Sequence, residues 1–193
     1  MRRLVDVIVS GIAGVLLAPV MAVVAVLVRL KMGSPVLFLQ RRSGLHGREF
    51  TIYKFRTMRA EAFSGEPDAV RDTSLGRTLR ATSLDELPQL LNVIKGDMSL
   101  IGPRPTLPEQ VVHYSERQRG RLAVRPGITG WAQVKVRNAA SWPERIELDL
   151  EYIEKRSLAL DLRIVGLTLL RLVRPSGLYG EGGVNQGFPA PTQ

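Results

Sequence analysis

The stretch RATSLDELPQLLNVIKGDMSLIGPRP, from Arg80 to Pro105, combines an acidic pair, a predicted helix and a proline-rich turn. Asp85 and Glu86 are adjacent carboxylates at the start of the helix, which we expect over residues 84–94. Arg80 precedes the pair, and Arg104 follows it in a Gly-Pro-Arg-Pro turn. Carboxylates bind hard cations and arginines bind phosphates. The stretch therefore contains what a site needs to hold a metal ion beside a phosphate.

The acidic pair also has a purely structural interpretation. Ser83 followed by Glu86 three residues later matches a capping box, and Pro88 lies early in the predicted helix, where a missing N–H group costs least. In that interpretation Asp85 and Glu86 only stabilise the positive end of the helix dipole. Composition alone favours this interpretation, and the surrounding motifs weigh against it.

The composition limits the classes of partner. The chain has 193 residues, enough for one domain with a membrane segment, and a formal net charge of +9, which indicates anionic partners such as lipid head groups, nucleotides or nucleic acid. The absence of cysteine excludes disulfides, thiolate ligands and a cysteine nucleophile. Because the two histidines, His46 and His113, are far apart in sequence, we expect any metal to be a hard cation held by oxygen ligands.

The N-terminal segment is the most apolar part of the chain. Residues 7–28 carry no charged side chain, and as a helix they would span about 33 Å, enough to cross a hydrocarbon core of about 30 Å. The long run and the basic residues that follow it do not fit a cleaved signal peptide. Pro19 should kink or break the helix, and basic residues at both ends favour keeping both flanks cytoplasmic. A re-entrant helix fits these observations, and a straight span with a tolerated proline is the alternative.

Local patterns predict the elements of the rest of the chain. Residues 34–42 and 48–58 should form a β-hairpin, with Lys54 and Arg56 on one face of its second strand. We expect a polar surface loop with at most a helical turn or two over residues 59–77, helices over 108–122 and 141–156, and a turn and short strand within 125–137. Ser141 followed by Glu144 three residues later predicts a capping box at the start of the second of these helices. Residues 158–173 should form an amphipathic helix suited to a membrane interface, or a core helix with a basic edge.

Four motifs lie along residues 54–142. They are KFRTM at 54–58, LRATSLDELPQLLNVIKGDMSLIGPRP at 79–105, RPGITGWAQV at 125–134 and RNAASW at 137–142. Together they resemble the bacterial sugar transferases, in the small monotopic form of the phosphoglycosyl transferases. The resemblance runs from the N-terminal helix to about Asp161. Val136 departs from the pattern, since many members have glycine there, which affects the backbone geometry expected near Arg137.

The resemblance implies an enzyme that transfers a sugar 1-phosphate from a nucleotide diphosphate sugar, usually a UDP-sugar, to polyprenyl (undecaprenyl) phosphate and releases UMP. Asp85 matches the family's nucleophile, which would form an aspartyl-phosphosugar intermediate. Glu86 matches its partner, which would help bind Mg²⁺ or manage a proton, and the metal would be held by Asp85 and Glu86. Other positions that match substrate-binding residues of the family are Lys54, Arg80, Arg104, Arg137 and Asp161.

The resemblance also implies a location and an organisation. We expect a re-entrant membrane helix over residues 1–31, broken at Pro19, a compact catalytic domain over 32–175 and an irregular tail over 176–193. The expected fold is α/β, mostly α, with a short β-hairpin and interfacial amphipathic helices. The enzyme would lie on the cytoplasmic face of the bacterial inner membrane, among membrane lipids and without nucleic acid, and catalyse the first membrane step of glycoconjugate assembly.

Two alternatives remain open at this point. A membrane-anchored basic adaptor that binds anionic lipid or nucleic acid would account for the charge and the N-terminal segment, but not for the acidic pair and its motifs. A metal-dependent pyrophosphatase that acts on UDP-sugars would use the same residues, with water in place of the lipid acceptor.

Overall fold

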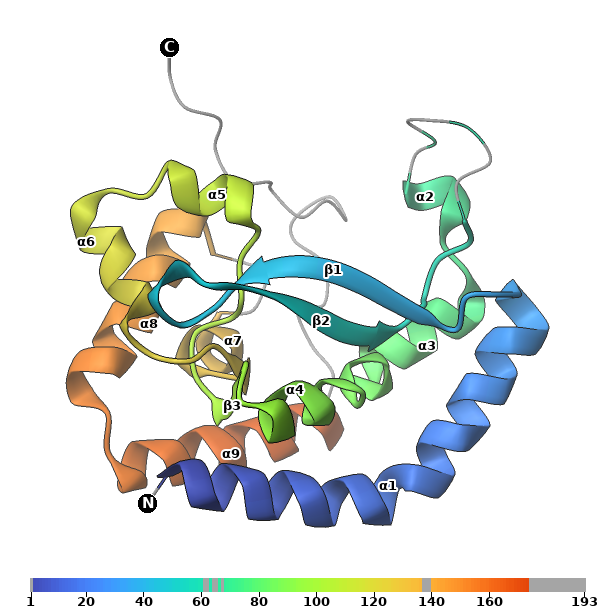
Figure 1. Ribbon diagram of the computed structural model, residues 1–193, viewed down its shortest axis with the longest axis horizontal. Coiled ribbons are helices and arrows are strands. Elements are labelled where there is room, and N and C mark those ends of the chain that lie inside the picture. The colour runs from blue at the N-terminus through green and yellow to red at the C-terminus, as the bar shows by residue number, and fades with distance from the viewer. Residues whose placement is uncertain (1, 61–62, 64–65, 67, 137–139, 174–193) are drawn as a thin grey trace. The chain divides into compact units, whose positions relative to one another are not determined.

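The computed structural model describes residues 2–60, 63, 66, 68–136 and 140–173 (Figure 1). The described chain is mostly helical with two short two-stranded sheets, as expected for an α/β fold dominated by helices. It divides into two compact units built from interleaved segments: residues 1–40 with 51–95, and residues 41–50 with 96–193. The predicted tail over residues 176–193 lies outside the described residues.

Helix α1 (Arg2–Met32) begins the first unit and continues through Pro19. Within the described part of the chain it is the one helix long and apolar enough to cross a membrane, judged by length and composition. Side chains such as Val15 and Leu16 are largely exposed. Figure 1 shows that α1 bends along its length, as expected when a proline removes a hydrogen bond inside a helix. The helix therefore continues through Pro19, and its re-entrant path remains a prediction.

The predicted hairpin is confirmed. Strands β1 (Leu37–Ser43) and β2 (Glu49–Phe55) form a two-stranded sheet, and a 3₁₀ turn, η1 (Leu45–Gly47), joins them. His46 and Gly47 both have positive φ, at 55° and 74°, which lets the chain reverse within these few residues.

The first unit continues with α2 (Asp68–Arg71) and α3 (Ser74–Ala81). Within residues 59–77, α2 and the first turn of α3 are the short helical turns that the expected loop allowed. Thr73 caps α3 by accepting a hydrogen bond from the Gly76 N–H at 2.9 Å. A Cβ atom at Gly76 would lie 1.8 Å from the carbonyl oxygen of Thr57, so only glycine allows the first turn of α3 to approach this backbone.

The expected helix over residues 84–94 is two elements: a 3₁₀ turn, η2 (Leu84–Glu86), and helix α4 (Gln89–Lys95). Ser83 adopts a left-handed conformation, with φ 57°, and its side chain caps nothing. An N-cap residue needs an extended backbone, so the predicted capping box does not form. Arg3 of α1 donates to the carbonyl oxygens of Val93 at 2.5 Å and Ile94 at 2.9 Å, and so stabilises the negative end of α4.

The second unit contains a parallel sheet of β3 (Ser99–Ile101) and β4 (Gly127–Thr129), in which Ser99 pairs with Gly127. The connection between them holds α5 (Pro108–Val112), α6 (Glu116–Arg119) and the 3₁₀ turn η3 (Gly120–Ala123). The prediction of one helix over residues 108–122 was wrong. Ser115 interrupts it, because its side chain forms a capping box with Gln118 and starts α6.

Three helices complete the second unit: α7 (Trp131–Lys135), which the sequence analysis did not predict, α8 (Trp142–Lys155) and α9 (Leu158–Val173). The capping box expected for α8 is confirmed, since Ser141 and Glu144 satisfy each other's backbone N–H groups. The core of this unit is a cluster of buried side chains from α7, α8 and α9: Trp131, Val134, Tyr152 and Ile164. One face of α9 stays exposed and apolar, with Leu162 and Leu169 among its residues, as expected of an amphipathic helix.

Candidate active site

The acidic pair lies in the 3₁₀ turn η2, directly before α4. Asp85 is buried, with 7% of its surface exposed. The N–H group of Glu86 donates to the carbonyl oxygen of Ser83 at 3.2 Å, which closes the turn. The left-handed Ser83 thus presents two adjacent carboxylates on a short, hydrogen-bonded segment.

Lys54 lies against the second carboxylate. Its Nζ donates to Oε1 of Glu86 at 2.6 Å, and both side chains are mostly buried, at 17% and 18% exposed. This ion pair joins β2 to η2 and brings together three residues that the sequence analysis selected. Arg56, which alternation placed on the same face of β2 as Lys54, is buried and donates to the carbonyl oxygens of Ser34 and Met32. Arg56 therefore fixes the chain that follows α1.

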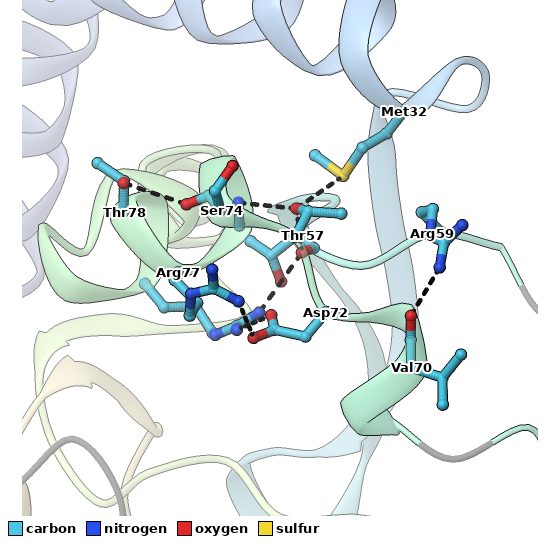
Figure 2. Close-up of polar contacts among 11 residues, drawn as sticks. Met32, Thr57, Arg59, Val70, Asp72, Ser74, Arg77 and Thr78 are labelled. Carbon is cyan, nitrogen blue, oxygen red and sulfur yellow. Dashed lines mark hydrogen bonds and ion pairs between the residues drawn. The ribbon is translucent and has the colours of Figure 1, made fainter.

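Arg80 also belongs to the first unit. Its guanidinium forms an ion pair with Asp72, which pairs with Arg77 as well, at 3.1 Å. Burial opposes ionisation of Asp72, but the hydrogen bonds from Arg80 and Arg77 outweigh it and hold the pKa of this carboxyl below its ordinary value. Figure 2 shows Asp72, Arg77 and Thr57 grouped at the start of α3. The Thr57 carbonyl oxygen accepts from Thr73 at 3.3 Å and from Arg80 at 3.5 Å.

The remaining predicted site residues lie in the second unit or outside the described chain. Arg104 is exposed in the Gly-Pro-Arg-Pro turn. Asp161, on α9, accepts a hydrogen bond from the hydroxyl of Tyr152 at 2.8 Å. Arg137 lies outside the described residues.

Glycines hold the Gly-Pro-Arg-Pro turn against the β4 strand. The Gly102 N–H donates to Thr129 and the Gly127 N–H donates to Pro103, both at 2.9 Å. A Cβ atom at Gly127 would lie 2.1 Å from the nitrogen of Gly102. Two separate motifs of the sequence, GPRP and PGITG, are thus the two halves of one backbone contact that positions Arg104.

A buried ion pair that was not predicted from the sequence lies beneath this turn. Arg121 and Asp149 are 4% and 1% exposed, and Nε of Arg121 donates to Oδ2 of Asp149 at 2.6 Å. Arg121 also donates to the hydroxyl of Tyr114 and to the carbonyl oxygen of Arg104, both at 2.8 Å. The sequence does contain one indication of this pair. Asp149 falls between Ile146 and Leu150 on the apolar face of α8, and a charged residue on such a face indicates a buried partner of opposite charge.

Burial and pairing act in opposite directions on the two charges of this pair. Burial raises the pKa of the Asp149 carboxyl, and Arg121 acts in the opposite direction. Burial likewise opposes the charge on Arg121, but Asp149 and Tyr114 outweigh it and raise the pKa of the guanidinium. Because arginine keeps its proton in proteins, Arg121 carries a positive charge into the interior, and Asp149 is the acidic group that faces it. Its function is to anchor Arg121, and through it the backbone of Arg104.

Positive charge gathers around the same turn. Arg121 and Arg145 both lie over the ring of Trp142, at 6.0 Å and 5.6 Å from its centroid. Burial, and then repulsion from Arg104 and Arg121, lowers the pKa of Arg145. Neighbouring arginines repel one another, and an anion bound near them would relieve this repulsion. This part of the second unit is therefore electrostatically suited to a phosphate.

The acidic pair fits a hard divalent cation. In the described part of the chain, no three histidine, aspartate or glutamate side chains gather in one place. Any ion at this turn would take its protein ligands from Asp85 and Glu86, and Lys54 already occupies one oxygen of Glu86. Mg²⁺ is commonly bound by one or two carboxylates, with water and substrate phosphate completing its shell. The donor set therefore suits Mg²⁺.

The lysine-bound acidic pair of the first unit and, in the second unit, the arginine on a hydrogen-bonded turn are each residue types that bind phosphate-containing substrates. The chain belongs to the bacterial sugar transferase family, whose pattern it matches over residues 1–175. This confirms the family resemblance that the motifs indicated.

Similar proteins carry more specific names. The chain is 54% identical over 154 residues to the uncharacterized sugar transferase EpsL of Bacillus subtilis (strain 168), covering 78% of this chain and 76% of that protein. It is 41% identical over 192 residues to the UDP-glucose:undecaprenyl-phosphate glucose-1-phosphate transferase of Xanthomonas campestris pv. campestris, covering 92% of this chain and 40% of that protein. It is 42% identical over 188 residues to the UDP-N-acetylgalactosamine-undecaprenyl-phosphate N-acetylgalactosaminephosphotransferase of Aeromonas hydrophila, covering 91% of this chain and 44% of that protein. The chain thus spans less than half the length of the last two relatives, whose names specify different sugars.

Proposed function

We propose that this protein transfers a sugar 1-phosphate from a UDP-sugar to undecaprenyl phosphate and releases UMP. The names of the relatives support the reaction class. The observation that carries the proposal for this chain is the η2 turn, which places the buried Asp85 beside a Glu86 held by Lys54. A solvated acidic first turn, the structural interpretation of the same residues, would need neither the burial nor the lysine.

In the first step, an oxygen of the Asp85 carboxylate attacks the phosphorus that bears the sugar. The bond from that phosphorus to the bridging oxygen breaks, and UMP leaves with this oxygen. The products are an aspartyl-phosphosugar and UMP, and no proton or electron is exchanged, because one anion displaces another. Covalent catalysis of this kind divides one difficult displacement into two easier ones.

In the second step, a phosphate oxygen of undecaprenyl phosphate attacks the same phosphorus. The bond to Asp85 breaks, the carboxylate is restored, and undecaprenyl diphosphate sugar remains in the membrane. Glu86 stays fixed by Lys54 through both steps, and Arg80 and Arg104 bind phosphate oxygens of the substrates. Phosphoryl transfer depends mainly on such positioning and charge stabilisation.

Mg²⁺ would be held by Glu86 together with Asp85, and when bound it would neutralise charge on the diphosphate of the donor. Lys54 orients Glu86 by donating a hydrogen bond to one oxygen of its carboxylate at 2.6 Å. Lys54 thus acts through Glu86 as well as through its own charge.

We also propose that the enzyme lies on the cytoplasmic face of the inner membrane, with α1 inserted in one leaflet as a re-entrant helix. The exposed apolar side chains of α1 support insertion, and the bend seen in Figure 1 is compatible with entry and return on one side. The acceptor phosphate lies at head-group depth, so insertion would hold the acidic pair near it and raise the chance of productive encounter.

The test is release of UMP from a panel of UDP-sugars by purified protein with Mg²⁺, in detergent or vesicles, with and without undecaprenyl phosphate. We expect UMP together with a lipid-linked product when the acceptor is present, and neither from Asp85→Asn. The control is the folded state of Asp85→Asn, measured by circular dichroism. Multiple-turnover UMP release without acceptor would instead support the pyrophosphatase, and binding to anionic vesicles that is unaffected by Asp85→Asn, without UMP from any donor, would support the adaptor.

A further inference from the structure

Asn92 is a buried polar residue of α4 that the reaction described above does not use. Its surface is fully buried. The side-chain oxygen Oδ1 accepts a hydrogen bond from the backbone N–H of Tyr53 at 3.1 Å, and Nδ2 donates to the backbone carbonyl oxygen of Thr51 at 2.7 Å. The side-chain amide of Asn92 therefore binds two backbone groups of β2, the N–H of Tyr53 and the carbonyl oxygen of Thr51.

These two bonds have the pattern of a strand contact. Thr51 and Tyr53 flank Ile52, which is buried, and a parallel neighbouring strand would likewise accept from one flanking residue and donate to the other. Within the described residues, β2 has a strand partner only in β1. The Asn92 amide takes the place of a third strand at this point and fixes α4 against β2 in one register.

The register matters because the Lys54–Glu86 ion pair joins the same strand, β2, to η2, the turn directly before α4. Lys54 directly follows Tyr53 on β2, and Glu86 lies six residues before Asn92, across the buried Pro88. The Lys54–Glu86 contact at 2.6 Å and the Tyr53–Asn92 bond at 3.1 Å therefore connect neighbouring residues of β2 to the two ends of segment 86–92. Together with the backbone between them, these two contacts form a closed ring. If α4 slides or tilts against β2, the distance between Nζ of Lys54 and Oε1 of Glu86 must change.

We propose that Asn92 is a positioning residue for the reaction, which it serves by holding Lys54 against Glu86 and so fixing the acidic pair. The inference rests on the proposed function. A displacement of about 1 Å at a reacting group can cost about 100-fold in rate, so a side chain with no contact to substrate can control turnover through this ring.

The first test is Asn92→Ala in the UMP-release assay with saturating undecaprenyl phosphate. We expect kcat to fall by about 10- to 100-fold, while KM for the UDP-sugar changes by less than about threefold. The second test repeats the substitution in a Lys54→Met background and measures single-turnover UMP release. Because Asn92 acts through Lys54, we expect Asn92→Ala to lower the rate by less than about twofold there.

Two matched variants separate positioning from stability. Lys95→Met removes another contact between α4 and β2, the bond from Nζ to the Tyr53 hydroxyl at 2.9 Å, and should leave kcat unchanged. Val93→Ala, which truncates a fully buried neighbour on α4, should destabilise the unit without changing kcat.

Hydrogen exchange gives a readout that does not depend on activity. In Asn92→Ala the Tyr53 amide should exchange faster, and in Val93→Ala it should change no more than its neighbours in β2. The inference is overturned if an active wild type loses the same factor from Asn92→Ala with and without Lys54, or if Val93→Ala lowers kcat as much. A wild type that releases no UMP with acceptor present contradicts the proposed function instead, and the exchange measurement still tests the register.

Discussion

Asp149→Ala is expected to lower the thermal midpoint of unfolding by about 6–20 °C, because it leaves a buried guanidinium without its counter-ion. Arg121 is 4% exposed and makes a 2.6 Å bond to Asp149. Removing one member of a buried ion pair costs about 3–5 kcal/mol. For a chain of 193 residues, each kcal/mol shifts the midpoint by about 2–4 °C, which gives the range stated.

The assay is thermal unfolding in detergent micelles, followed by tryptophan fluorescence. Trp142 is a suitable reporter, since its ring lies 6.0 Å from the guanidinium carbon of Arg121. The same variant should lower transferase activity well below the melting range, because Arg121 also holds the carbonyl oxygen of Arg104 at 2.8 Å.

The matched control is Glu147→Ala, on the same helix. Glu147 pairs with Arg117 at 2.7 Å, but the two side chains are 53% and 64% exposed. Solvent screens such a pair, and the freed arginine stays hydrated, so we expect no measurable shift of the midpoint. If Asp149→Ala shifts the midpoint by no more than Glu147→Ala, the reasoning from burial is refuted.

Gly76→Ala should destabilise the protein by about 1–3 kcal/mol or more, because its Cβ would meet the Thr57 carbonyl oxygen at 1.8 Å. Gly166→Ala, where nothing lies within 4 Å, should instead stabilise α9 by about 0.5–1 kcal/mol, and opposite shifts of the thermal midpoint check both. Asp72 has a lowered pKa in the folded state, so its stabilising contribution is complete above its ordinary pKa and is lost as the pH falls below about 4. Asp72→Asn should therefore flatten the acid limb of the stability profile, and an unchanged limb would count against the ion pair with Arg80.

The elements that sequence predicted correctly are those whose signals are local. The hairpin follows from two runs rich in β-branched and aromatic residues on either side of SGLHG at 43–47. The start of α8 follows from the capping pattern of Ser141 and Glu144. The acidic pair was selected from its neighbours in sequence, and its burial beside Lys54 is in keeping with that selection.

The elements that sequence missed depend on backbone conformation or on distant partners. The same Ser-x-x-Glu pattern caps α8 but fails at Ser83, because a left-handed serine there turns the chain before η2. Lys54 and Glu86 are 32 residues apart, and Arg121 and Asp149 are 28 apart. No local periodicity specifies such pairs, which form only once the chain within each unit folds.

The most direct test of the account is the covalent intermediate on Asp85. Purified protein is incubated with Mg²⁺ and single UDP-sugars in the absence of undecaprenyl phosphate, and its intact mass is measured. The account predicts a mass increase of one sugar phosphate with the correct donor, accompanied by one equivalent of UMP, and no increase in Asp85→Asn. Transfer to undecaprenyl phosphate without any such adduct, or an adduct that persists in Asp85→Asn, would contradict it.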